Sequence, residues 1–268
     1  MKNFFLRAFS PLFLIFLVSG AARADDWTIE TEKILRELIT SSDDARGISP
    51  EAIVSLGEPP YSSLLSKVTE ESSYALTFFA DGMPRIIVSE LSKAIPFGGV
   101  SLDLDDSGTD GSAKYSLTAA SGFLPNRWLR EIASSCGARG IRVRTSPRGW
   151  YARGRIATNG LKTSLHELVH AYEDKPFPGL ERELKAAFYE RRTKGKKLRN
   201  LSRITNLYFY GAKEKYRGGF VWQYLGKEHG EELLSAGIEC VMWNRFDIWN
   251  RDPELVKFLL GMMIFFGC

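Results

Sequence analysis

Two of the three histidines in the chain stand four residues apart, in the segment 163-TSLHELVHAYED-174, and a glutamate directly follows the first of them. In an α-helix, side chains four residues apart lie on the same face, one above the other. His166 and His170 can therefore both reach one zinc ion, with Glu167 beside it. In an H-E-x-x-H site of this kind the glutamate acts as general base toward a zinc-activated water.

The same segment also has an interpretation without a metal. Ser164 and Glu167 have the spacing of a helix capping box, and two histidines can simply cover a helix face. Because the whole chain contains so few histidines, we favour the metal site. We therefore predict His166 and His170 as ligands of a single Zn²⁺ ion and Glu167 as the catalytic base.

The H-E-x-x-H segment resembles the zincin metallopeptidases. The preceding segment, 150-WYARGRIATN-159, is similar to the strand at the sheet edge beside the active-site helix of that group. The resemblance covers about residues 140–245. It implies an enzyme that binds an extended peptide along this strand through backbone hydrogen bonds and hydrolyses a peptide bond.

A catalytic zinc needs a third protein ligand and one open position for water. The metzincin pattern would place a histidine six residues after His170, where this chain has Pro176, so that class is excluded. The segment 224-YLGKEHGEELLSAGIECVMW-243 resembles the second helix of the glutamate-zincins and putative zincin domains of phage and bacterial proteins. This resemblance implies Glu239 as the third ligand.

Helical spacing is consistent with that choice, because Glu239 would share one inward face with Glu232 and Ser235. The alternatives for the third ligand are Glu232, Asp174 and His229. Where the thermolysin-like pattern has an aspartate, four residues after the ligand glutamate, this chain has Trp243, so the surroundings of the ligand must differ. As donors to the oxyanion we propose His229 and Tyr224, with Tyr210 and Tyr216 as alternatives.

Apolar periodicity and turn residues give a coarse fold. Helices are expected at 26–42, after Ser49-Pro50, and at 125–135, 163–174, 178–195, 230–243 and 252–266. Short strands are expected at 74–80, 84–90, 99–105, 115–121, 139–146 and 150–159. This order predicts an α+β fold, with a zincin-like mixed sheet packed on the HExxH helix and a mainly helical C-terminal part. We expect an N-terminal helical segment at 25–60 and the metallopeptidase domain at 61–268.

The first 24 residues have the three parts of a secretory signal peptide. Lys2 and Arg7 precede the apolar run 11-PLFLIFLVSG-20, and Ala22-Arg23-Ala24 forms a cleavage site. The run is about half as long as the ~20 residues that a membrane span needs. We therefore expect an exported protein, periplasmic or secreted, that is not stably inserted in the membrane after cleavage.

Cleavage would leave 33 basic residues (36 minus Lys2, Arg7 and Arg23) against 32 acidic ones, a balance that does not indicate nucleic acid binding. The three cysteines, Cys136, Cys240 and Cys268, allow one disulfide, with no preferred pair.

Two further segments have alternative interpretations. The loop 103–112 is similar to a calcium loop, but Lys114 occupies the position of the bidentate glutamate, which favours a plain acidic turn. The basic run 191–203 is expected to be a solvated surface, or else a contact to an anionic membrane or cell-wall polymer.

The sequence as a whole predicts an exported zinc metallopeptidase that acts on a peptide or protein substrate. A non-catalytic zincin-scaffold binding protein and a zinc amidase acting on cell-wall peptides are the alternatives.

Overall fold

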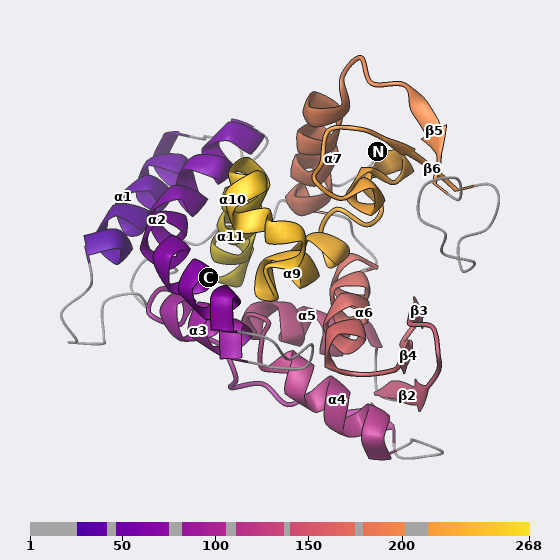
Figure 1. The fold of residues 1–268 in the computed structure, drawn as a ribbon. Coiled ribbons are helices and arrows are strands. Elements are labelled where there is room, and N and C mark those ends of the chain that lie inside the picture. Colours follow the sequence, from indigo (N-terminus) through magenta and orange to yellow (C-terminus); the bar gives the residue numbers. More distant parts are fainter. Residues whose placement is uncertain are drawn as a thin grey trace, which may run out of the picture.

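The computed structural model describes residues 26–41, 47–74, 82–105, 111–136, 140–174, 179–201 and 214–268. The expected signal peptide (1–24), most of the expected strand at 74–80, half of the calcium-like loop (106–110) and Tyr210 lie outside these residues. The described part is an α+β fold, as the order of elements predicts (Figure 1). Helices predominate in it, because two of the expected strands are helices.

The helices fall into two groups along the chain. Five precede strand β2: α1 (Asp26–Ser41), α2 (Pro50–Tyr74), α3 (Gly82–Leu91), α4 (Gly111–Ser121) and α5 (Asn126–Cys136). The later helices are α6 (Leu161–Glu173), α7 (Leu180–Thr193), α9 (Ser235–Met242), α10 (Ile248–Arg251) and α11 (Pro253–Gly267). Short 3-10 turns flank α9: η5 (Gln223–Gly226), η6 (Glu228–Gly230) and η7 (Arg245–Asp247).

The main sheet is small and mixed. Its strand order is β1-β2-β4-β3, formed by β1 (Leu104–Asp105), β2 (Ile141–Thr145), β4 (Arg155–Thr158) and β3 (Trp150–Ala152). The first three strands run parallel, and β3 pairs antiparallel with β4, with Tyr151 opposite Ile156. β3 therefore lies at the edge of the sheet. A separate two-stranded sheet pairs β5 (Leu198–Asn200) antiparallel with β6 (Lys215–Arg217).

The strands predicted at 84–90 and 115–121 are wrong, because these segments form helices α3 and α4. In α3, Met83, Ile87 and Leu91 are buried at helical spacing, so packing overrides the preference of the Ile-Ile-Val run for strands. In α4, Ala113, Leu117 and Ala120 are buried in the same way. The segment 99–105 is strand only at its end, whereas strands are confirmed within 139–146 and 150–159.

The core is centred on the contact between α2 and α11, which lie side by side (Figure 1). The two helices approach closely at glycines. A Cβ atom on Gly57 would lie 1.8 Å from the Lys257 carbonyl oxygen, and one on Gly261 would lie 2.0 Å from the Ile53 carbonyl oxygen.

The boundary expected at residue 60 falls inside α2, so this helix belongs in part to each of the two segments predicted from the sequence.

The apolar C-terminal tail is a core helix, as predicted. Its buried residues include Phe258, Leu259, Leu260, Met262 and Met263. No helix within the described residues combines the length and the apolar character that crossing a bilayer requires.

Of the basic run 191–203, Arg191 and Arg192 form ion pairs with Glu254 at the start of α11, so they tie α7 to the core. The three cysteines are unbonded.

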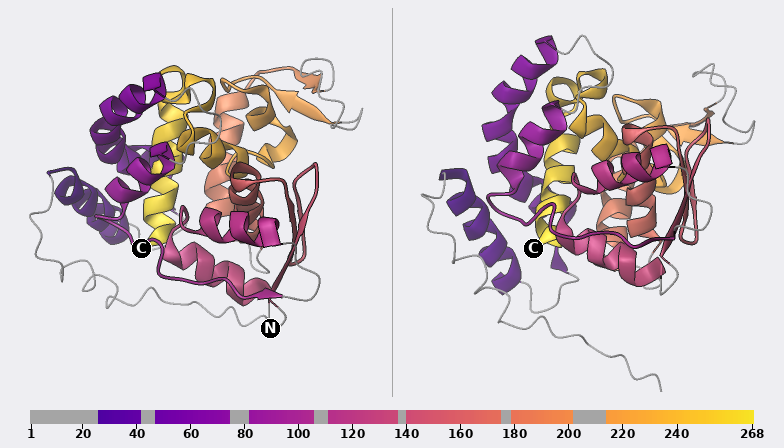
Figure 2. Two further views of the ribbon diagram at one scale, coloured as in Figure 1. Left: turned by 60° about the horizontal axis from the view of Figure 1, so that its bottom comes forward. Right: turned by 90° about the horizontal axis from the view of Figure 1, so that it is seen from below.

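The central helix α6 is fixed by packing on several sides, against α4, α5, α9 and the strands β3 and β4 (Figure 2). Its buried side includes Leu165, Leu168 and Tyr172, and the Tyr172 ring stacks on Trp128 at 4.1 Å. Ser164 does not cap the helix; its hydroxyl is buried and lies 2.8 Å from the Thr158 hydroxyl. Because this side of α6 is packed, the opposite side, which carries both histidines, faces a cavity.

Candidate metal centre

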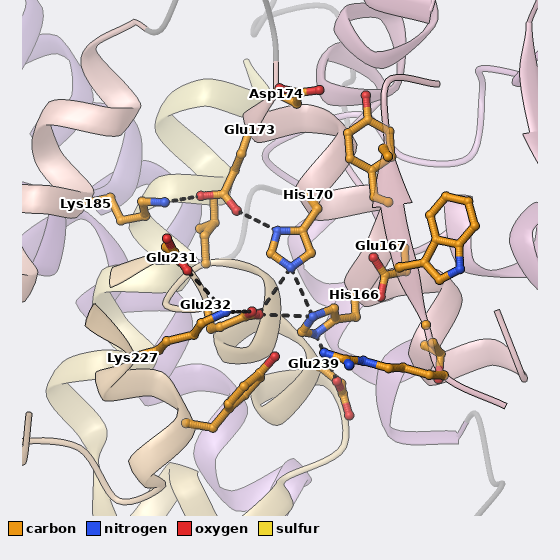
Figure 3. Close-up of a pocket in the computed structure, with 18 of the residues that line it drawn as sticks. His166, Glu167, His170, Glu173, Asp174, Lys185, Lys227, Glu231, Glu232 and Glu239 are labelled. Atoms are coloured by element: carbon orange, nitrogen blue, oxygen red, sulfur yellow. Dashed lines mark hydrogen bonds and ion pairs between the residues drawn. The ribbon is translucent and has the colours of Figure 1, made fainter. Parts of the chain in front are cut away.

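A cavity of about 780 Å³ lies over the exposed face of α6. Its base is formed by side chains of α6, one wall by residues 147–153 around β3, and the other by α7 and residues 222–245. Figure 3 shows that His166, His170 and Glu232 point toward one another within it. The elements that line it are far apart in the sequence, so the fold as a whole creates this site.

Three ligand atoms converge on one point of the cavity. His166 Nε2 lies 3.1 Å from His170 Nε2, and each lies 3.2 Å from Glu232 Oε2. A tetrahedral zinc ion with bonds of about 2.0–2.1 Å holds its ligand atoms about 3.3 Å apart. Two imidazole nitrogens and one carboxylate oxygen at these separations therefore fit a single zinc ion with a fourth position left for water.

The other nitrogen of each imidazole faces a second carboxylate. His166 Nδ1 lies 3.3 Å from Glu239 Oε2, and His170 Nδ1 lies 3.6 Å from Glu173 Oε2. Arg245 forms an ion pair with Glu239, and Lys185 forms one with Glu173. Each histidine therefore contacts Glu232 through one nitrogen and a charge-paired carboxylate through the other.

The electrostatics of the cluster favour positive charge between the rings. Burial opposes protonation of the imidazoles, but the neighbouring carboxylates, led by Glu232 for His166 and by Glu173 for His170, raise the pKa of His166 to about 10 and that of His170 to about 9. Although burial raises the pKa of Glu232, the two histidines hold it well below the usual range. A divalent cation satisfies the same carboxylates, and it binds the imidazoles in their neutral form.

Glu167 lies outside this cluster but lines the same cavity, as the base of an H-E-x-x-H site should. Its side chain is buried, and burial raises its pKa despite the opposing effect of the two histidines. Gly149 leaves room for its carboxylate, because a Cβ atom there would lie only 2.5 Å from Glu167 Oε1. A raised pKa makes a carboxylate a stronger base.

Glu239 and Glu232 occupy different positions from those that helical spacing suggests. Helix α9 begins at Ser235, so Glu232 lies in the turn before it rather than on its face. This turn brings Glu232 to the Nε2 atoms, whereas Glu239 reaches the opposite edge of the His166 ring. The alternative ligand Glu232 therefore has the ligand geometry, and the preferred residue Glu239 lies behind His166.

Of the remaining predicted residues that the structure describes, two line the cavity and two do not. Tyr224 lines the cavity, with its ring 6.4 Å from that of His166. Asp174 lines it too but is not part of the ligand cluster. His229 is exposed and does not line the cavity, because it occupies a left-handed turn (φ 61°) in η6. Tyr216 is buried in β6, away from the cavity lining.

Sequence reasoning missed Glu173, Lys185 and Arg245. Glu173 follows His170 by three residues, so the spacing along α6 could have placed it beside that ring. No comparable signal marks Lys185 or Arg245, which come from other elements.

Comparison of the chain with protein-family models, with curated proteins and with solved structures finds no match. The chemistry of the site is therefore the ground on which a function can be argued.

Proposed function

We propose that this protein is a zinc-dependent peptidase whose metal is held by His166, His170 and Glu232. The observation that carries the proposal is the convergence of two Nε2 atoms and one carboxylate oxygen, 3.1–3.2 Å apart, at the base of a cavity. Three protein ligands with an open fourth position are the arrangement of a catalytic zinc, whereas structural sites have four protein ligands. The mixed sheet beside α6 supports a zincin-like arrangement.

Zinc bound at these ligands would supply a water of lowered pKa and polarise the scissile carbonyl group. Glu167 takes the proton from the attacking water and delivers it to the leaving amine. The hydroxyl of Tyr224, in the facing wall, donates to the carbonyl oxygen as charge develops there. β3 is the last strand of its sheet among the described residues, and its outer edge would offer backbone N–H and C=O groups to an extended peptide. We exclude the exposed His229 from the catalytic residues.

The test uses the purified chain and Glu167→Gln. Both are expected to bind one zinc ion, and the wild-type chain to cleave members of a peptide library. Glu167→Gln removes the proton acceptor but no ligand, so we expect a loss of turnover of about 100-fold or more with the zinc content unchanged. Undiminished turnover in this variant would contradict the assigned mechanism. Including cell-wall muropeptides among the substrates separates a peptidase from an amidase.

One observation favours a non-catalytic alternative. The carboxylates raise the pKa values of both histidines, so protonated imidazoles can balance the cluster without a metal. A binding protein that retains such an ion-pair network would contain no stoichiometric zinc and cleave no peptide. Metal analysis of the purified wild-type chain distinguishes such a binding protein from a zinc enzyme.

Residues 1–24 lead us to propose in addition that the protein is exported.

A further inference from the structure

We propose that the residues of two ion pairs position the histidines for the metal. Glu239 and Arg245 orient the imidazole of His166, and Glu173 and Lys185 orient that of His170. The inference rests on the proposed metal site and deepens it. It assigns Glu239 a place behind a ligand rather than a place on the metal.

The two nitrogens of each ring explain how such positioning works. Both Nε2 atoms face Glu232, so the Nδ1 atoms lie on the far edges of the rings, where Glu239 Oε2 is 3.3 Å and Glu173 Oε2 is 3.6 Å away. A carboxylate at Nδ1 favours the tautomer that carries its proton there. The lone pair is then on Nε2, as metal binding requires, and the ring is held in one orientation.

The position of Glu239 depends on Arg245. The guanidinium group forms an ion pair with Glu239 and lies 5.1 Å from the Trp222 ring and 5.3 Å from the Phe246 ring. The same turn holds Asn244 (φ 42°), Phe246 (φ 60°) and Asp247 (φ 53°) in left-handed backbone conformations. Such conformations are unfavourable for non-glycine residues and often occur at functional sites. The turn thus has a conformation that holds Arg245 against the carboxylate behind His166.

The position of Glu173 depends in the same way on α7. Lys185, only 13% exposed, extends from that helix to Glu173 at the end of α6, so this ion pair joins the two helices behind His170 (Figure 3). A largely buried ion pair is often no more stabilising than an apolar contact of similar volume. Its presence here, directly behind a histidine that faces Glu232, agrees with a role in orienting that histidine.

The test compares Glu239→Gln, Glu173→Gln, Arg245→Met and Lys185→Met with the wild-type chain. The affinity for zinc is measured by competition with a chelator. We expect about 10- to 100-fold weaker binding for the glutamate variants, as is typical when a partner of a metal ligand is lost. The two cation variants should show smaller losses, and Arg245→Lys should recover part of the affinity. Arg217→Met removes an exposed ion pair with Glu190 and is the control, expected to bind zinc normally.

Cobalt substitution separates positioning from ligation, and thermal unfolding of each metal-free variant shows that it is folded. Glu232→Gln should change the cobalt absorption spectrum, because it removes a ligand. Glu239→Gln should keep the wild-type spectrum once it is saturated with cobalt. Two results would overturn the inference without removing the metal site: wild-type zinc affinity in all four variants, or the spectrum of Glu232→Gln appearing in Glu239→Gln. Absence of zinc binding by the wild-type chain would overturn the proposed function as well.

Discussion

Among single residues, Gly149 directly limits the space around Glu167, the proposed catalytic base. A Cβ atom at this position would lie 2.5 Å from Glu167 Oε1 and 2.2 Å from Thr163 Cγ2. We therefore expect Gly149→Ala to displace the Glu167 carboxylate and lower kcat by about 10- to 100-fold, since small misplacements of reacting groups have effects of this size. Neither contact involves a proposed metal ligand, so zinc content should stay the same.

The matched control is Gly111→Ala, because a Cβ atom there meets nothing within 4 Å. Steady-state kinetics and metal analysis of both variants check this expectation. An unchanged kcat in Gly149→Ala would argue against a catalytic role for Glu167 in this position.

The spacing of the histidines along α6 was sufficient to predict that His166 and His170 face the same point. The partner carboxylate could not be chosen in this way. Its position depends on where α9 begins, and the turn before Ser235 shifts Glu232 to the Nε2 atoms and Glu239 to Nδ1. Periodicity assumes a continuous helix, so it fails where a short turn interrupts one.

Among the elements, α2 and α11 depend on glycine for their close contact. A Cβ atom on Gly261 would lie 2.0 Å from the Ile53 carbonyl oxygen, which belongs to backbone and cannot rotate away. We expect Gly261→Ala to separate the helices and lower the free energy of unfolding by about 1–3 kcal/mol, the usual cost of overpacking. Gly218→Ala, where a Cβ atom meets nothing within 4 Å, should change stability little. Urea unfolding of both variants measures the difference, and equal stabilities would argue against the close helix contact.

The elements also show where sequence patterns succeed. The helices α1, α5, α6, α7 and α11 and the strands β2, β3 and β4 lie within predicted segments or close to their limits. The errors at α3 and α4 have one cause. Their apolar residues are short runs that fit a strand or a buried helix equally well, and only their packing against other helices decides between them.

For the molecule as a whole, Glu90 ties three helices together. This buried carboxylate of α3 accepts hydrogen bonds from Trp27 of α1 and from Ser63 and Lys67 of α2, and Lys93 donates a further one. Burial alone would raise its pKa, but the hydrogen bonds from the two lysines and Trp27 lower it to about 2. The ionised carboxylate therefore stabilises the fold above the unfolded-state pKa of about 4.5, and this contribution is lost as the pH falls toward 2.

Glu90→Gln is expected to lower the free energy of unfolding at pH 7 by about 1–2 kcal/mol, a value reduced to allow for the partly exposed lysines. The difference from the wild-type chain should shrink as the pH falls from 4.5 toward 2. Glu190→Gln, which changes an exposed carboxylate, is the control. Urea unfolding between pH 2 and pH 7 measures this dependence, and a difference that does not vary with pH would contradict it.

The fold as a whole brings His166, His170 and Glu232 together, and we propose that these three residues bind one zinc ion. A crystal soaked in zinc and measured on both sides of the zinc absorption edge tests it most directly. We predict one anomalous peak, at about 2.0–2.2 Å from Nε2 of each histidine and from a Glu232 carboxylate oxygen. A map without a peak among these three residues, or with the ion between His166 Nδ1 and Glu239, would contradict it.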